Sequence, residues 1–277
     1  MKVWLIAEMT FHEARQRRLV WIGALLGLLF LGVFALGYHY MYQDVSRYAG
    51  AFTTQVISAA NGFALMGLYA VNFLGVMLAV IISVDTLSGE IASGTIHTIA
   101  TKPLRRWEIV VGKWLGLLAM LSLFIVFLCA GLTLITWLIA RHIPPNIMQG
   151  TALMILCGTV VMTLSLLGST YLAALANGVV VLMLYGLAFA AGWMEEFGAI
   201  FQNTSAVRVG IVISLLMPAE AMWKRAAYLM QPGFLREFGM SPFGAGSAPS
   251  SAMVVYTLLY VLVILAAAVR LFQRRDL

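Results

Sequence analysis

The chain has 277 residues, of which 62% are hydrophobic and 10% are charged, and its formal net charge is +6. Soluble domains carry about 25% charged residues, so this composition excludes a water-soluble fold and predicts a polytopic membrane protein. The positive charge is explained by lysines and arginines in loops, which set the orientation of membrane proteins. We therefore expect a lipid membrane as the surroundings, and no nucleic-acid partner.

Six apolar runs are long enough to cross a bilayer, which takes about 17–25 residues. They lie at roughly 19–37, 62–84, 114–140, 151–173, 177–193 and 253–269, with a tight turn at 174–177. The sequence thus predicts an all-α fold with six transmembrane helices. If the N-terminus is cytoplasmic, eleven of the 17 basic residues lie on the inner side: Lys2, Arg15, Arg17, Arg18, Lys102, Arg105, Arg106, Lys113, Arg270, Arg274 and Arg275. This bias favours an inner-membrane (plasma-membrane) protein with both termini in the cytoplasm.

The extracytoplasmic segment 194–252 contains one further apolar stretch, at 207–217. About 11 residues are too few to span a bilayer, so we expect a short re-entrant or interfacial helix there. The alternative is a seventh span, which would place Arg270, Arg274 and Arg275 outside.

Several kinds of chemistry are missing from the sequence. The predicted spans contain no Asp, Glu, Lys, Arg or His in their interiors, which argues against an ion-coupled transporter. Gly112 and Lys113 are followed by Trp114, and Trp107 replaces the first glycine of a phosphate-binding loop. The cysteines and histidines form no metal-binding pattern, and Ser165 and Ser169 are interpreted as helix-packing hydroxyls. We therefore predict no catalytic, cofactor-binding or metal-binding residue in this chain.

The N-terminal residues predict an amphipathic helix over residues 1–18. Trp4, Ala7, Phe11 and Ala14 recur at helical spacing, and charged residues lie off that stripe. Such a helix would lie in the inner membrane interface before the first span. The alternative is a basic tail without this role.

The cytoplasmic segment 85–113 predicts a short helix followed by a turn. Pro103 stops any helix that precedes it, and Arg105, Arg106, Trp107 and Glu108 suit an interfacial anchor before the third span. A soluble domain could grip such a helix and turn. The alternative is an ordinary loop with charges that set topology.

The sequence of this segment resembles that of the corresponding segment in ABC transporter type-2 permeases. The matching residues are Asp85, Ser88, Gly89, Glu90, Gly94, Thr95, Pro103, Arg106, Gly112 and Lys113. Residues 216–221 are similar to the family's segment before the last span, although Met217 replaces the usual Asn. The resemblance extends over residues 1–277 and implies a single transmembrane domain. It also implies a coupling helix that sits on a separate ATP-binding subunit, with Asp85, Ser88, Gly89, Glu90, Gly94, Thr95, Pro103 and Arg106 as the coupling residues.

The function implied by the resemblance is that of the permease subunit of an ATP-driven exporter. Two permease copies, identical or related, would work with two ABC ATPase subunits, and ATP and Mg would be bound by the ATPase. The alternative is an envelope assembly factor with the same architecture, which passes conformational change to an extracytoplasmic partner without moving a solute. A membrane enzyme or passive channel is disfavoured by the missing catalytic groups. The sequence does not predict the residues that bind substrate.

Overall fold

The computed structural model describes the chain except for residues 1, 17, 49–52, 90–104, 233–248 and 275–277. Its described residues form helices and connections, and they contain no strand. In chain order, the helices are α1 (Lys2–Gln16), α2 (Arg18–Tyr48), α3 (Thr53–Ser83), α6 (Arg106–Ala140), α7 (Ile147–Gly168), α8 (Ala174–Ile200), α9 (Thr204–Leu216), α10 (Ala219–Leu229) and α12 (Ser251–Arg274).

Six of these helices, α2, α3, α6, α7, α8 and α12, are long and apolar enough to cross a membrane. The predicted all-α fold with six spans is therefore confirmed. The third span begins earlier than predicted, at Arg106 rather than at residue 114. Glu108 accepts a hydrogen bond from the Arg105 backbone N–H at 2.8 Å, and this contact starts the helix before the apolar run does.

The predicted turn at 174–177 is wrong by several residues. α7 ends at Gly168, the turn occupies residues 169–173, and Asn177 lies inside the first turn of α8. The backbone N–H groups of Ser169 and Leu172 bond to the carbonyls of Ser165 and Gly168 at 2.9 Å each. These bonds close the turn inside the predicted apolar run, where Gly168, Ser169 and Thr170 mark it in the sequence.

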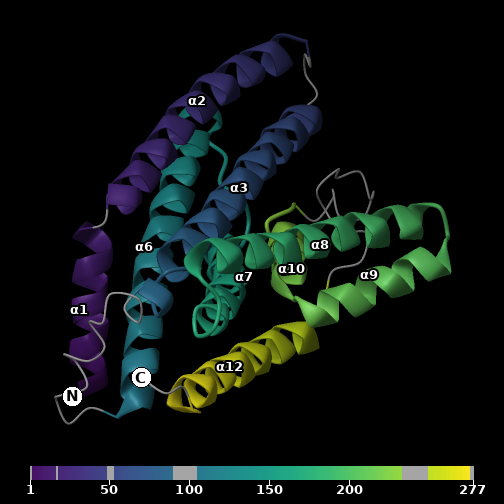
Figure 1. Cartoon of the computed structure of the whole chain (residues 1–277). Helices are drawn as coiled ribbons and strands as arrows, with labels where there is room; N and C mark the ends of the chain where they lie inside the picture. Colours follow the sequence, from purple (N-terminus) through teal and green to yellow (C-terminus); the bar gives the residue numbers. More distant parts are fainter. Residues whose placement is uncertain (1, 17, 49–52, 90–104, 233–248, 275–277) are drawn as a thin grey trace.

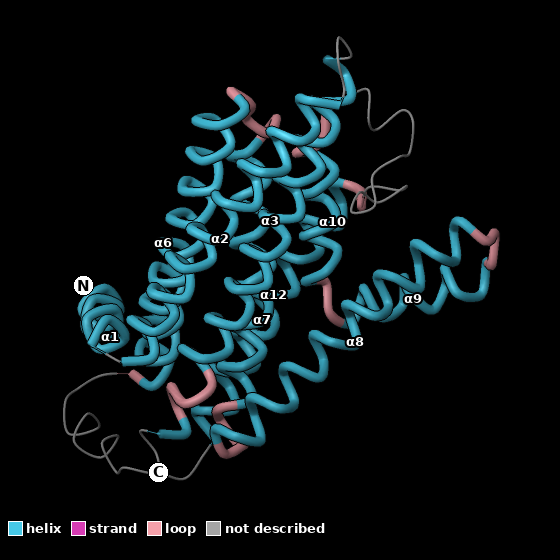
Figure 2. The backbone as a smooth tube through the Cα atoms, turned by 90° about the horizontal axis from the view of Figure 1, so that it is seen from above, coloured by secondary structure: helices cyan, strands magenta, loops and turns pink. Residues whose placement is uncertain are grey.

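The helices α3 and α7 form the centre of the bundle, and they are the most buried of the six spans. Figure 1 shows α6 running alongside α2 and α3, with α1 beside the lower part of α6. Seen from above in Figure 2, α8 and α9 form a pair that projects from the other helices. The apolar faces of α2, α8 and α12 are largely exposed, as expected for helices that contact lipid or another membrane subunit.

The start of α1 and the end of α12 both lie beside the first part of α6, at one end of the bundle (Figure 1). Arg106, the first residue of α6, donates to the Gln273 carbonyl of α12 at 3.1 Å. Gly112 of α6 lies against Ile6 and the Val3 carbonyl of α1. We call this end of the bundle, which also carries the connection from α3 to α6, the α1–α12 end.

The short helices α9 and α10 form a bent pair, with an angle of 106° between them. Pro218, which cannot continue the helical hydrogen bonds, lies at the bend. α9 begins just after α8, and the Leu229 carbonyl at the end of α10 accepts a bond from Asn146 in the α6–α7 connection at 3.1 Å. Both ends of the pair therefore lie opposite the α1–α12 end. By length and composition the pair fits a broken span or a re-entrant loop, and the re-entrant interpretation stays a prediction.

The bend leaves carbonyl groups at the end of α9 without helical hydrogen-bond donors, and side chains of α12 supply the donors. Tyr256 donates to the Leu215 carbonyl at 2.6 Å, and Tyr260 donates to the Leu216 carbonyl at 2.8 Å. Backbone groups inside a membrane must be satisfied within the protein. These two tyrosines therefore fix the broken helix pair against the last span.

Candidate functional site

The candidate coupling residues fall into two groups. Asp85, Ser88 and Gly89 lie just after α3 and are partly exposed, and Arg106 begins α6. Glu90, Gly94, Thr95 and Pro103 lie outside the described residues, as does most of the predicted coupling helix. The structure thus places the two ends of the coupling segment together at the α1–α12 end.

Gly89 is in direct contact with Asp85. A Cβ added to Gly89 would lie 2.5 Å from the Asp85 carboxylate oxygen Oδ1, and the Gly89 N–H donates to the Asp85 carbonyl at 3.0 Å. A side chain at position 89 would therefore have to displace the Asp85 carboxylate, which is the flexible end of that residue. Glycine at position 89 thus leaves room for the Asp85 side chain to lie against the backbone.

Two side chains bind the backbone that leaves α3. Lys113 of α6, which is 4% exposed, donates from Nζ to the Thr86 carbonyl at 3.2 Å. Asn177 of α8 donates from Nδ2 to the Val84 carbonyl at 3.2 Å and to the Ser165 carbonyl of α7 at 2.8 Å. Buried backbone carbonyls need such partners. The chain after α3 is consequently bonded to α6 and α8, and through Asn177 to α7.

An apolar cluster completes the attachment. Leu87 is fully buried, although Asp85 before it and Ser88 and Gly89 after it are partly exposed. It packs with Val110 of α6, Leu166 of α7, and Leu265, Ala268 and Phe272 of α12. Burying a leucine side chain contributes about 1.5–3 kcal/mol. Segment 84–89 therefore contacts four helices and cannot shift independently of them.

Helix α1 packs against the same part of α6 through glycines. A Cβ on Gly116 would lie 2.6 Å from the Ala7 carbonyl and 2.9 Å from Thr10 Cβ. Ala7 and Ala14 are buried, whereas Trp4, Leu5 and Met9 are exposed. The Gly112–Gly116 pair is thus used for packing inside the chain. The interfacial position of α1 remains a prediction.

The interior contains ionisable groups that the sequence interpretation did not expect. Glu220 and Lys224 of α10 are only 5% and 8% exposed. Lys224 donates from Nζ to Glu195 at 3.0 Å and to the Gly192 carbonyl at 2.9 Å, both on α8. Glu220 and Lys224 lie outside the six spans, but the bent pair α9–α10 carries them into the bundle. The predicted spans carry no ionisable group in their interiors, but the bundle does bury these two residues of α10.

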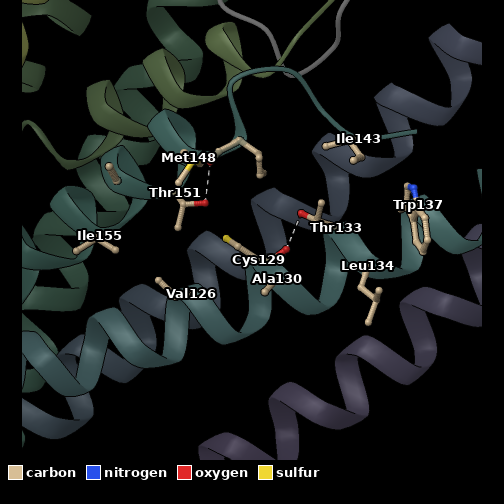
Figure 3. A pocket seen from close by; sticks show the side chains of 12 residues that line it. Val126, Cys129, Ala130, Thr133, Leu134, Trp137, Ile143, Met148, Thr151 and Ile155 are labelled. Carbon is tan, nitrogen blue, oxygen red and sulfur yellow. Dashed lines mark hydrogen bonds between the residues drawn. The ribbon is translucent and has the colours of Figure 1, made fainter. Parts of the chain in front are cut away.

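A large apolar groove of about 630 Å³ lies between α6 and α7, as Figure 3 shows. Its hydroxyl groups are bonded to their own helices: Thr133 donates to the Cys129 carbonyl at 2.7 Å, and Thr151 donates to the Ile147 carbonyl at 2.8 Å. Trp137 and Met148 complete a mostly hydrocarbon lining. This groove suits an acyl chain or another apolar group, and its lining offers no charged residue that would select a substrate.

Sequence reasoning did not predict the hydrogen-bond partners of Lys113, Asn177 and Lys224, or the burial of Glu220. Gly112 and Lys113 were interpreted as motif residues, and Lys113 also as a basic residue of the inner side. Residue 177 was predicted as the end of a tight turn. A signal was present for Glu220 and Lys224, because they lie four residues apart in a segment after Pro218, where they share one helix face. Their burial depends on contacts with α8 that sequence spacing does not reveal.

The chain is similar in sequence to known proteins. Residues 4–277 match the family described as "ABC-2 family transporter protein". A weaker similarity is to a protein of Stutzerimonas stutzeri named "Probable ABC transporter permease protein NosY", which is 31% identical over 135 residues. That match covers 48% of this chain and 45% of the relative, so the chain matches less than half of the relative's length.

Proposed function

This chain belongs to the ABC-2 family and is a membrane permease component of an ABC transporter, and we propose that it exports its substrate using ATP hydrolysed by a separate subunit. ATP and Mg would be bound by that ABC ATPase. A second permease copy, identical or related, would complete the membrane part. The exposed apolar faces of α2, α8 and α12 provide surface for such a copy and for lipid.

The observation that carries the proposal is the attachment of segment 84–89. Its backbone is bonded to Lys113 and Asn177, and its Leu87 is buried among α6, α7 and α12. A displacement imposed on the residues that follow Gly89 would therefore be transmitted to several spans together. Packed helices transmit such a displacement as a rigid-body movement. This arrangement supports coupling to an ATPase at the α1–α12 end.

The proposal requires the α1–α12 end to face the cytoplasm, where ATP is available. Arg105 and Arg106 lie at this end, and Arg270 and Arg274 lie near the end of α12. Basic residues near the ends of spans favour the cytoplasmic side. The bent pair α9–α10 would then open toward the extracytoplasmic side.

The test is co-purification of this chain with a candidate ABC ATPase, followed by measurement of ATP hydrolysis in lipid. We expect a stable complex that hydrolyses ATP, and no hydrolysis by this chain alone. An ATPase with its nucleotide-binding lysine replaced is the matched control, because it should bind without hydrolysing ATP. Hydrolysis by the chain purified without any ATPase would contradict the proposal.

A further inference from the structure

A small cavity lined by carboxyl, amine and aromatic side chains lies where α10 meets α3 and α8. Its volume is about 20 Å³, close to the roughly 10–15 Å³ that one water molecule requires. Its lining comprises Tyr69 of α3, Gly192, Trp193 and Glu196 of α8, and Glu220, Trp223 and Lys224 of α10. The cavity is too small for a transported substrate, so any ligand it takes is of atomic size.

Glu220 contributes an unpaired oxygen to this cavity. The side chain is 5% exposed, and its Oε2 has no hydrogen-bond partner within the described part of the chain. A Cβ added at Gly192 would lie 2.9 Å from Glu220 Cγ, so the glycine allows the carboxyl group to approach α8. An ionised carboxylate buried without a partner is strongly unfavourable.

The neighbouring cation does not resolve this problem. Lys224 is hydrogen-bonded to Glu195 and to the Gly192 carbonyl. Its single ammonium group cannot neutralise the carboxylates of Glu195, Glu196 and Glu220 together. Glu196 is a second carboxyl group in the same lining. A metal cation would need more oxygen ligands than this lining supplies, since two of its walls are tryptophans, and Lys224 would repel it.

We propose that the cavity between α3, α8 and α10 is a proton-binding site, in which the Glu220 carboxyl group holds the proton. The O–H bond formed at Glu220 removes the unpaired charge and leaves Lys224 paired with Glu195. The site goes beyond the proposed export function, because proton binding here does not require the ATPase. Release of the proton would create a buried carboxylate and favour another position of α10.

The ionisable surroundings of Glu220 are consistent with this assignment. They are Tyr69 of α3, Cys157 of α7, Tyr185, Glu195 and Glu196 of α8, and Lys224 of α10. Farther along α10, Arg225 donates to the Pro249 carbonyl and Tyr228 is half-buried, and Arg208 of α9 is exposed. Burial raises the pKa of Glu220 to about 7; Lys224 lowers it and Glu196 raises it.

Infrared spectroscopy of the purified chain in lipid tests the site directly, through the C=O stretch of a protonated carboxyl group. We expect this band at pH values below neutral, its loss as the pH rises through neutral, and its absence in Glu220→Gln. Glu8→Gln, which changes an exposed carboxyl group on α1, is the control and should retain the band. No titrating band in the wild type, or the same band in Glu220→Gln, would overturn the proposal.

A second variant keeps the test decisive if Glu220→Gln does not fold. Lys224→Gln removes the cation that favours the ionised form, so the midpoint for loss of the band should move to higher pH. An unchanged midpoint would contradict the assignment. An ionised carboxylate with a bound water in the cavity would give no protonated band at any of these pH values, and would also overturn it.

Discussion

The ammonium group of Lys113 on α6 donates a hydrogen bond of 3.2 Å to the backbone carbonyl of Thr86, three residues beyond the end of α3. The lysine is 4% exposed, so the bond lies in a water-poor setting where a lost partner is costly. It joins the start of the third span to the start of the coupling segment. This contact links α3, α6 and the coupling segment, so we expect the three to move together.

Replacement of this lysine should weaken this link. Lys113→Met keeps the length of the side chain but removes the donor, and hydrogen bonds to charged groups contribute about 1.5–3 kcal/mol. We expect a lower free energy of unfolding by roughly that amount, measured by denaturation in detergent. Arg47→Ala, which changes an exposed residue at the end of α2, should have little effect. Equal stability of the two variants would contradict the role assigned to Lys113.

The contact between α1 and α6 gives a second prediction. In Gly116→Leu the new side chain would collide with the Ala7 carbonyl, which lies 2.6 Å from the position of its Cβ. We expect α1 to be displaced and to become accessible to protease. Gly32→Leu is the matched control, since nothing lies within 4 Å of a Cβ at Gly32. If both variants resist protease equally, α1 is not held by this close packing.

The raised pKa of Glu220 predicts a pH-dependent stability. The unfolded chain loses this proton near pH 4.5, whereas the folded chain keeps it to about pH 7. Because the unfolded state binds fewer protons across this window, the free energy of unfolding should fall as the pH rises from about 4.5 to about 7. Thermal denaturation of Glu220→Gln should lack this part of the pH dependence. Identical pH profiles for the variant and the wild type would contradict the prediction.

The orientation of the chain can be measured with reporters. A reporter fused after Leu277 should lie in the cytoplasm, because the α1–α12 end carries Arg105, Arg106, Arg270 and Arg274. A reporter inserted between Pro144 and Pro145, in the α6–α7 connection, should be extracytoplasmic. An external reporter after Leu277 would require the opposite orientation or a seventh span.

The sequence predicted the spans well because apolar length is a local property. The six runs and the short stretch at 207–217 were each found from composition alone, and all correspond to helices. Helix ends were predicted less well. The start of α6 depends on Glu108 bonding to Arg105, and the turn after Gly168 depends on backbone bonds within an apolar run.

Residues of the candidate coupling site could be predicted only where they belong to the family motif. The motif located Asp85, Ser88, Gly89 and Arg106 at one end of the bundle, but it gave no reason for Gly112 or Lys113. Those reasons are tertiary: Gly112 admits α1, and Lys113 binds the Thr86 carbonyl. The interior group around Glu220 was missed for the same cause, since burial of α10 depends on the bend at Pro218 and on packing against α8 and α7.

The central claim is that the coupling segment transmits ATP-driven change from a separate ATPase to the spans. It is tested most directly by measuring ATPase binding and transport for Glu90→Ala and Gly94→Val in the reconstituted complex. Loss of a charge-assisted contact costs about 1.5–3 kcal/mol, or roughly 10–150-fold in affinity. We expect Glu90→Ala to weaken binding to that extent or to uncouple hydrolysis from transport, and Gly94→Val to act similarly, while expression and membrane insertion stay unchanged. Arg47→Ala should behave as the wild type. Wild-type complex formation together with wild-type transport in both loop variants would contradict the account.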